Sequence, residues 1–394
     1  MLEKNAVQAE GRPLWKTIVV IVGVILLVAA CLAIRGLLLR SDAASRDFIS
    51  YWSSAKLLAA HHNPYDRAAI FRLEMSQQAH FAKPLVMRNP PWALFLVMPL
   101  GWVSLSTAAL LWMVLIIVCA LGAIQLMRRP GAGEVPLTLL LFAPTVICAG
   151  AEQTSIFTLL GVVLFLRWQK SRPFAAGLAL LPAMLKPHLL VLFWVVLVLE
   201  MWRRREWRLV AGGVFGMLVA NAVALVFDPR VWQDYLKAMK AEQLGAVYCP
   251  NVSDSLRLLI APNAVWMEAL PTVAGIAVAV WYWRRWRGRW DWWRQGAMLI
   301  ALSVLTAPYA WPFDQVLFLP AMMSTLAAVP KRAFYLLGAA NLAALAIYIR
   351  HPFLETPVYV WMAPVWMAWC IYAYTRRVPQ VPDAVRREMR KQIA

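Results

Sequence analysis

The stretch Arg46–Trp52 (RDFISYW) lies shortly after the first long apolar segment, residues 16–35, inside a polar loop. From Asp47 to Ala60, apolar and polar residues recur with helical periodicity, and Asp47 stands at the expected N-cap position of the helix. The two faces are Phe48, Trp52, Ala55 and Ala59, and Asp47, Ser50, Tyr51 and Ser54. This pattern predicts an amphipathic helix that lies on a membrane surface.

The composition places this helix in a membrane protein. Hydrophobic residues make up 62% of the 394 residues, and 15% are charged. The apolar residues come in blocks of roughly 15 to 23, long enough to cross a bilayer. A barrel would need short alternating segments instead, so we predict an all-α polytopic membrane protein.

The formal charge of +19 does not predict nucleic-acid binding, because the basic residues sit in short turns between apolar blocks. Cytoplasmic loops have this composition under the positive-inside rule. These turns contain Arg128–Arg129, Arg167–Arg172, Arg203–Arg208, Arg284–Arg294, Lys331–Arg332 and Arg376–Arg377. Several of the 21 Trp residues flank them and are expected to anchor the chain at the headgroups. We read the stretch Trp281–Trp293 as such an anchor.

The apolar blocks predict one domain, residues 1–394, with about twelve crossings (11–13) and both termini in the cytoplasm. The expected spans are 16–35, 105–127, 136–150, 154–168, 173–186, 188–202, 208–227, 264–283, 295–308, 313–329, 332–349 and 358–374. Residues 92–103 are read as a re-entrant helix, and the first span as a transmembrane helix, since it lacks a signal-peptide cleavage site. The remaining segments are tails 1–15 and 375–394, a first outer loop 36–90 and a second outer loop 228–262.

The turns left on the outer side carry the unusual polar residues. They contain Glu152-Gln153, Lys186-Pro187-His188, Asn251 and Ser253, the stretch Tyr309–Asp314, and His351. Ionisable residues at membrane depth are expensive and mark functional sites by default. We therefore expect the site on the same side as Asp47.

Soluble nucleotide substrates and metal-centred chemistry find little support. The sequence has no glycine-rich phosphate loop, HExxH, nucleophile elbow or Asp-x-Asp, and its five cysteines show no CxxC spacing. No cofactor or metal is predicted.

Each polar residue has a structural and a functional interpretation. Asp47 is either a helix cap or a general base that takes a proton from an acceptor hydroxyl. For Lys186 and His188, the structural interpretation is a snorkelling lysine and a histidine that faces a pore or is merely capped. The functional interpretation is that the two bind an anion such as a phosphate leaving group. Glu152 and Gln153 either cap the next span or bind sugar hydroxyls, and Asp314 is either a cap or a second carboxylate of the site.

Taken together, several motifs resemble the polyprenol-phosphate-dependent glycosyltransferases of family 87, in the GT-C superfamily. They are DFxxYW (47–52), NPYD (63–66), NPP (89–91), EQTSI (152–156), AGLAL (176–180) with KPH (186–188), and YAWPFD (309–314). The resemblance covers about residues 40–330, with one departure: Glu152 stands where the family more often has Gly.

The resemblance implies a GT-C helical bundle that transfers a sugar, mannose or a pentofuranose, from a polyprenyl phosphate with inversion. The acceptor would be a lipid or a glycan, and the site would face the extracytoplasmic side of a bacterial inner membrane. Asp47 carries over as the catalytic base, and Lys186 and His188 as phosphate contacts. The predicted substrate-binding residues are Tyr51, Asn89, Glu152, Gln153, Lys186, His188, Asn251, Tyr309 and Asp314.

A transporter or lipid flippase without transferase activity is the alternative. Polar residues at helix breaks would suit it, but they fall on one side and no inverted repeat is evident.

Overall fold

In the computed structural model of the chain, the described residues are mainly helical and contain no strands. They comprise residues 46–77, 83–127, 140–241, 247–326 and 329–376. The predicted first span, 16–35, and both tails lie outside them. The all-α prediction is therefore confirmed for the described part of the chain.

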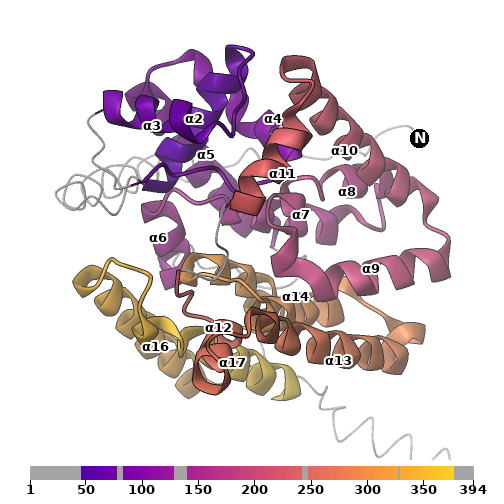
Figure 1. Cartoon of the computed structure of the whole chain (residues 1–394). Coiled ribbons are helices and arrows are strands. Elements are labelled where there is room, and N and C mark those ends of the chain that lie inside the picture. The colour runs from indigo at the N-terminus through magenta and orange to yellow at the C-terminus, as the bar shows by residue number, and fades with distance from the viewer. Residues whose placement is uncertain (1–45, 78–82, 128–139, 242–246, 327–328, 377–394) are drawn as a thin grey trace, which may run out of the picture.

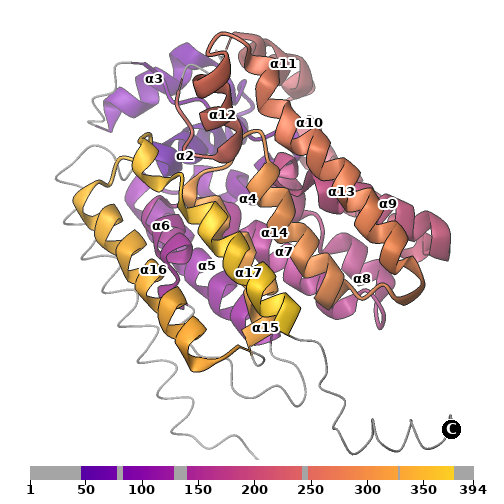
Figure 2. The same ribbon diagram turned by 90° about the horizontal axis from the view of Figure 1, so that it is seen from below.

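The longer helices cover most of this part, and Figures 1 and 2 show their arrangement. They are α2 (Arg46–Ala59), α3 (Arg67–Ser76), α4 (Leu94–Val97), α5 (Leu105–Leu126), α6 (Ala143–Gly150), α7 (Ser155–Trp168), α8 (Pro173–Leu178), α9 (Val191–Arg204), α10 (Trp207–Phe227), α11 (Val231–Ala241), α12 (Val252–Ile260), α13 (Leu270–Trp286), α14 (Ala297–Thr306), α15 (Leu319–Thr325), α16 (Lys331–Arg350) and α17 (Met362–Arg376).

Short helical turns join them. They are η1 (Pro91–Ala93), η2 (Met98–Trp102), η4 (Pro182–Leu185), η5 (Pro187–Leu190), η6 (Val265–Ala269), η7 (Arg287–Arg289), η8 (Trp292–Gly296), η9 (Pro312–Phe318) and η11 (Pro357–Tyr359). Many of them begin at a proline, which fits the first turn of a helix and breaks a continuing one.

Four helices among the described residues are long and apolar enough to cross a bilayer: Leu105–Leu126, Trp207–Phe227, Val265–Arg289 and Lys331–Arg350. A fifth is reached if Pro173–Leu185 and Pro187–Arg204, which meet at an angle of 119°, count as one broken span. Pro91–Trp102, which nearly coincides with the segment 92–103 that we predicted to be re-entrant, forms a shorter apolar helix. A membrane protein is thus supported, while the count of twelve crossings stays a prediction.

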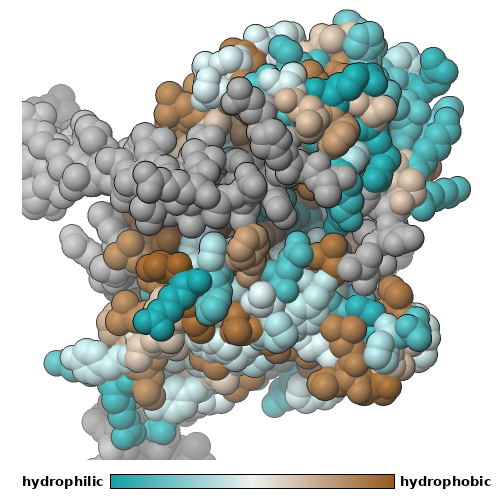
Figure 3. Space-filling view, turned by 60° about the vertical axis from the view of Figure 1, so that its left-hand side comes forward, coloured by the Kyte–Doolittle hydropathy of each residue, from teal (hydrophilic) through white to brown (hydrophobic). Residues whose placement is uncertain are grey.

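Apolar side chains are exposed along these helices, as a lipid-facing surface requires. On α10 and α16 they include Leu218, Val226, Leu336, Leu342 and Ile349. On the face in Figure 3, hydrophilic side chains gather at the upper right, with hydrophobic ones exposed lower down.

Helix α2 has a different environment from the one predicted. It forms as expected, but residues 48–55 are buried on all sides, including Ser53 and Ser54 at 0% exposure. The helix packs on η2, where Gly101 lets the two backbones meet: a Cβ there would lie 2.4 Å from the Ala55 carbonyl oxygen. This part of α2 is therefore a core helix, and its place at a membrane surface is not confirmed.

Arginines lie at one end of several helices, and the residues predicted for the site lie at the opposite end. Helices α7, α9 and α13 all end in arginines, among them Arg167, Arg204 and Arg285. The basic ends of α9 and α13 meet at the buried Glu200, which accepts hydrogen bonds from Arg203 Nη2 at 2.7 Å and from Trp283 Nε1 at 2.9 Å. The opposite ends of α7 and α9 carry the residues predicted for the site.

Candidate active site

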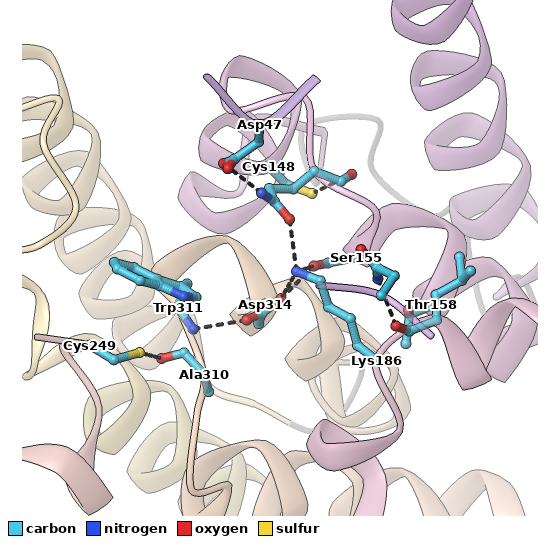
Figure 4. A network of polar contacts seen from close by, with 12 residues as sticks. Asp47, Cys148, Ser155, Thr158, Lys186, Cys249, Ala310, Trp311 and Asp314 are labelled. Carbon is cyan, nitrogen blue, oxygen red and sulfur yellow. Dashed lines mark hydrogen bonds and ion pairs between the residues drawn. The ribbon is translucent and has the colours of Figure 1, made fainter. Parts of the chain in front are cut away.

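Side chains from four distant segments meet in one hydrogen-bonded chain (Figure 4). Asp47 comes from the first turn of α2, Gln153 from the turn before α7, Lys186 from the break before α9, and Asp314 from η9. All four were predicted from the sequence, and the structure brings them together. Their roles stay predictions.

Lys186 occupies the centre of this chain, at the apex of the 119° bend between η4 and η5. Its Nζ donates to Gln153 Oε1 at 2.9 Å, to Ser155 Oγ at 3.0 Å and to Asp314 Oδ1 at 2.8 Å. An ammonium group has three N–H donors, so these contacts use all of them. The side chain is 10% exposed, and its Nζ also lies 4.4 Å from the centre of the Phe313 ring.

Asp314 is fully buried, and the first of its two predicted interpretations, a helix cap, is seen in the structure. As a cap, its Oδ2 accepts a hydrogen bond from the Trp311 N–H at 2.8 Å at the start of η9. Its Oδ1 accepts from Lys186 and from Ser155 Oγ, and its role as a second carboxylate of the site stays a prediction. The ion pair offsets the large penalty for burying a carboxylate.

Gln153 connects this ion pair to Asp47. Its Oε1 accepts from Lys186 Nζ and, at 3.4 Å, from the Tyr51 hydroxyl, while its Nε2 donates to Asp47 Oδ2 at 2.6 Å. Burial raises the pKa of Tyr51 well above its usual value, with the charge of Asp47 adding to the shift, so the phenol keeps its proton to donate.

Asp47 is partly exposed, unlike the other three. Helix α2 begins at Arg46, so Asp47 lies inside the first turn and does not occupy the expected N-cap position. Its carboxylate instead contacts Gln153 across 106 positions of sequence. Partial exposure leaves it the most accessible carboxylate of the group.

Glu152 is buried beside Gln153, and its backbone adopts the left-handed conformation with φ of 54°. Its carbonyl accepts a hydrogen bond from Trp112 Nε1 on α5 at 2.8 Å. Few residues other than glycine adopt this conformation, which suits the Gly that the family more often has here. The substrate role of the Glu152 side chain stays a prediction.

A second group lies next to Lys186 and consists of His188, Tyr309 and Arg88. The rings of His188 and Tyr309 are 5.8 Å apart, and Arg88 Nη1 donates to the Tyr309 hydroxyl at 3.4 Å. Nε2 of His188 is buried with no hydrogen-bond partner among the described residues. Burial raises the pKa of Tyr309 to about 12, so its hydroxyl stays protonated at neutral pH.

Asn89 and Asn251 make backbone contacts that hold the site in place. Asn89 Nδ2 donates to the Leu185 carbonyl at 2.9 Å, directly before Lys186. Asn251 caps α12 by accepting from the Asp254 N–H at 2.7 Å, and its Nδ2 donates to the Pro308 carbonyl at 3.3 Å. These contacts fix the segments that carry Lys186 and Asp314, and direct substrate binding by either asparagine stays a prediction.

Sequence reasoning did not select two residues that belong to these groups, Arg88 and Ser155. Arg88 directly precedes the NPP motif, and Ser155 stands two residues after Gln153. Their position next to recognised motif residues was the available signal. The prediction that no metal is needed is not tested.

The fold and these groups define a helical membrane protein with carboxylates, a lysine and a histidine gathered where several helices begin. A family model for glycosyltransferase family 87 matches residues 88–311, more than half of the chain. The chain belongs to this family and is a glycosyltransferase. The matched segment includes Gln153, Lys186 and His188, while Asp47 and Asp314 lie outside it. No curated protein and no solved structure matches the chain significantly.

Proposed function

We propose that the enzyme transfers a sugar, mannose or a pentofuranose, from a polyprenyl-phosphate donor to a lipid or glycan acceptor, with Asp47 as general base. The observation that carries the proposal is the placement of Asp47: a partly exposed carboxylate that accepts a hydrogen bond from Gln153, which in turn binds the Lys186–Asp314 ion pair. A base must be held in one orientation and still be reachable by the acceptor hydroxyl.

The proposed reaction is a single displacement. The acceptor oxygen attacks the anomeric carbon from the face opposite the phosphate, while the bond from that carbon to the phosphate oxygen breaks. The electron pair of this bond leaves with the polyprenyl phosphate, and the acceptor proton passes to Asp47. Attack from the opposite face inverts the anomeric configuration.

The departing phosphate needs donors where its charge accumulates. His188 Nε2 and the Arg88 guanidinium are the candidates, since His188 Nε2 lacks a protein partner among the described residues and Arg88 is exposed. Arg88 suits this role because a guanidinium donates two parallel hydrogen bonds to a phosphate. The phosphate contact expected for Lys186 stays a prediction.

We further propose that the site faces the extracytoplasmic side of a bacterial inner membrane. The basic ends of α7, α9 and α13 would then lie in the cytoplasm, as the positive-inside rule requires. A lipid-linked donor could reach the site from the bilayer. The transporter alternative has no observation that favours it over the family assignment.

The test is transfer from a panel of radiolabelled polyprenyl-phosphate sugars into membrane extracts, with wild type beside Asp47→Asn. The substitution keeps an oxygen that can accept from Gln153 Nε2, so folding should survive while kcat falls about 10²- to 10⁴-fold. Asp234→Asn on α11 is the matched control, because this carboxylate makes a long 3.9 Å contact with the exposed Lys237.

Label incorporated by wild type and by the control, but not by Asp47→Asn, would identify the donor and support the base. Equal incorporation by all three would remove Asp47 from the mechanism. No incorporation from any donor would overturn the polyprenyl-phosphate proposal.

A further inference from the structure

We infer that the Lys186–Asp314 ion pair acts on the reaction through Gln153, as a positioning unit that orients the base Asp47. Lys186 would not then be a cation for the donor phosphate. The inference rests on the proposed function and assigns a role to Gln153, Lys186 and Asp314.

The charge of Lys186 fixes which way the Gln153 amide is turned. An amide side chain can be turned so that either its oxygen or its nitrogen points in a given direction. An ammonium can only donate, so Lys186 must face Oε1, as the 2.9 Å contact shows. Nε2 is then forced to face Asp47, where it donates at 2.6 Å.

The three N–H donors of Lys186 are already occupied by protein partners. All three N–H bonds go to protein oxygens, and the positive charge lies 2.8 Å from a fully buried carboxylate. A phosphate could bind Lys186 only by displacing one of these partners. His188 Nε2, close to Lys186, has no hydrogen-bond partner among the described residues to displace.

The Gln153 amide in turn orients the carboxylate of Asp47. A carboxylate that accepts a fixed N–H bond is held in one orientation, and this orientation decides whether it can take a proton from the acceptor hydroxyl. In a reversed amide, the Gln153 oxygen would face the carboxylate and repel it. The ion pair therefore sets the geometry of a base that it does not touch.

The experiment measures kcat and the KM for the donor in a set of variants. Gln153→Glu keeps the side-chain shape and the contact with Lys186 but has no N–H for Asp47. We expect Gln153→Glu and Gln153→Ala each to lower kcat about 10- to 100-fold, as losses of groups that orient a catalytic residue do, with little change in KM. Gln295→Ala is the matched control. Gln295 is also buried, but it accepts a hydrogen bond from the Asp291 N–H before the start of α14, whereas Asp314 lies after the end of α14.

The ion pair is tested by removing both charges together, with Lys186→Met combined with Asp314→Asn, which avoids a buried unpaired carboxylate. If the pair acts through Gln153, this double variant lowers kcat to a similar degree. Adding Gln153→Ala should then cause no further loss, since interacting residues give non-additive effects.

The outcomes separate the two proposals. Losses that multiply, or a raised donor KM in the Lys186 variant, would mean that Lys186 acts independently on the substrate and would overturn the inference alone. Full activity of Gln153→Glu would also overturn it. An inactive wild type with every donor would overturn the proposed function, and this inference with it.

Discussion

Lys186 Nζ lies 2.8 Å from Asp314 Oδ1 although the two residues are 128 positions apart, and the pair is almost completely buried. Neither charge can be removed alone without leaving the other in a medium that solvates it poorly. The pair thus joins the bend before α9 to η9.

Lys186→Met is expected to reduce the free energy of unfolding by about 3–5 kcal/mol, the usual range for breaking a buried ion pair. Combining it with Asp314→Asn should recover much of this loss. Thermal unfolding in detergent measures both variants. Lys240→Met, at an exposed lysine of α11, is the control and should change stability by no more than about 0.5 kcal/mol. If the double variant were less stable than Lys186→Met, the pair would not be the cause.

Gly101→Ala is expected to destabilise the protein by about 1–3 kcal/mol and to lower kcat, because a Cβ would collide with the α2 backbone. Displacing α2 moves Asp47 with it. Gly338→Ala is the control, since nothing lies within 4 Å of a Cβ built there and α16 gains a better helix former. Unfolding midpoints of the two variants compare them, and equal midpoints would contradict the close approach of α2 and η2.

Glu74→Gln is expected to stabilise the protein at alkaline pH. Glu74 is fully buried in α3, and burial raises its pKa from 4.5 to about 7, against the opposing effect of a hydrogen bond from the Leu85 N–H. Because the folded-state pKa is the higher one, its contribution to stability is complete below pH 4.5 and is lost as pH rises through about 7. The loss amounts to about 3 kcal/mol at pH 8.

Denaturation at pH 4.5 and pH 8 measures this effect. Wild type should lose more stability between the two values than Glu74→Gln, whose amide cannot ionise. The exposed Glu355→Gln is the control and should follow wild type. Parallel curves for Glu74→Gln and wild type would show that the carboxyl ionises normally.

His188→Ala is expected to raise the donor KM about 10-fold if His188 Nε2 binds the phosphate, a loss of the size of one hydrogen bond to a charged group. His188→Gln, which offers an amide N–H, should restore part of the affinity. His62→Ala, at an exposed histidine after α2, should leave KM unchanged. A fall in kcat at constant KM would instead place His188 with the groups around Asp47.

The sequence allowed the residues of the central chain to be predicted better than their partners. Asp47, Gln153, Lys186 and Asp314 were recognisable because charged and amide groups are rare in apolar stretches. That Gln153 would bridge Asp47 to Lys186 could not be predicted, since it depends on contacts across 106 and 33 positions. Ser155 looked like an ordinary hydroxyl at a helix start.

The helix boundaries show the same limit. The span 208–227 was predicted nearly to its ends, because α10 is mostly apolar and is bounded by the charged residues Glu206 and Asp228. The helical segments on either side of Lys186 were predicted too, but not the 119° bend between them, which falls just before Pro187. Helix α2 has an amphipathic pattern, yet its polar face is buried against protein.

The order of the four residues along the chain has a consequence for biosynthesis. Asp47 and Gln153 are translated before Lys186, and Asp314 comes last, so the lysine enters the membrane without its counter-ion. The network closes only when the chain has been inserted as far as η9. A nascent or truncated chain that lacks this segment cannot form the Lys186–Asp314 pair, and under the proposed role of Gln153 it would not hold Asp47 in its orientation.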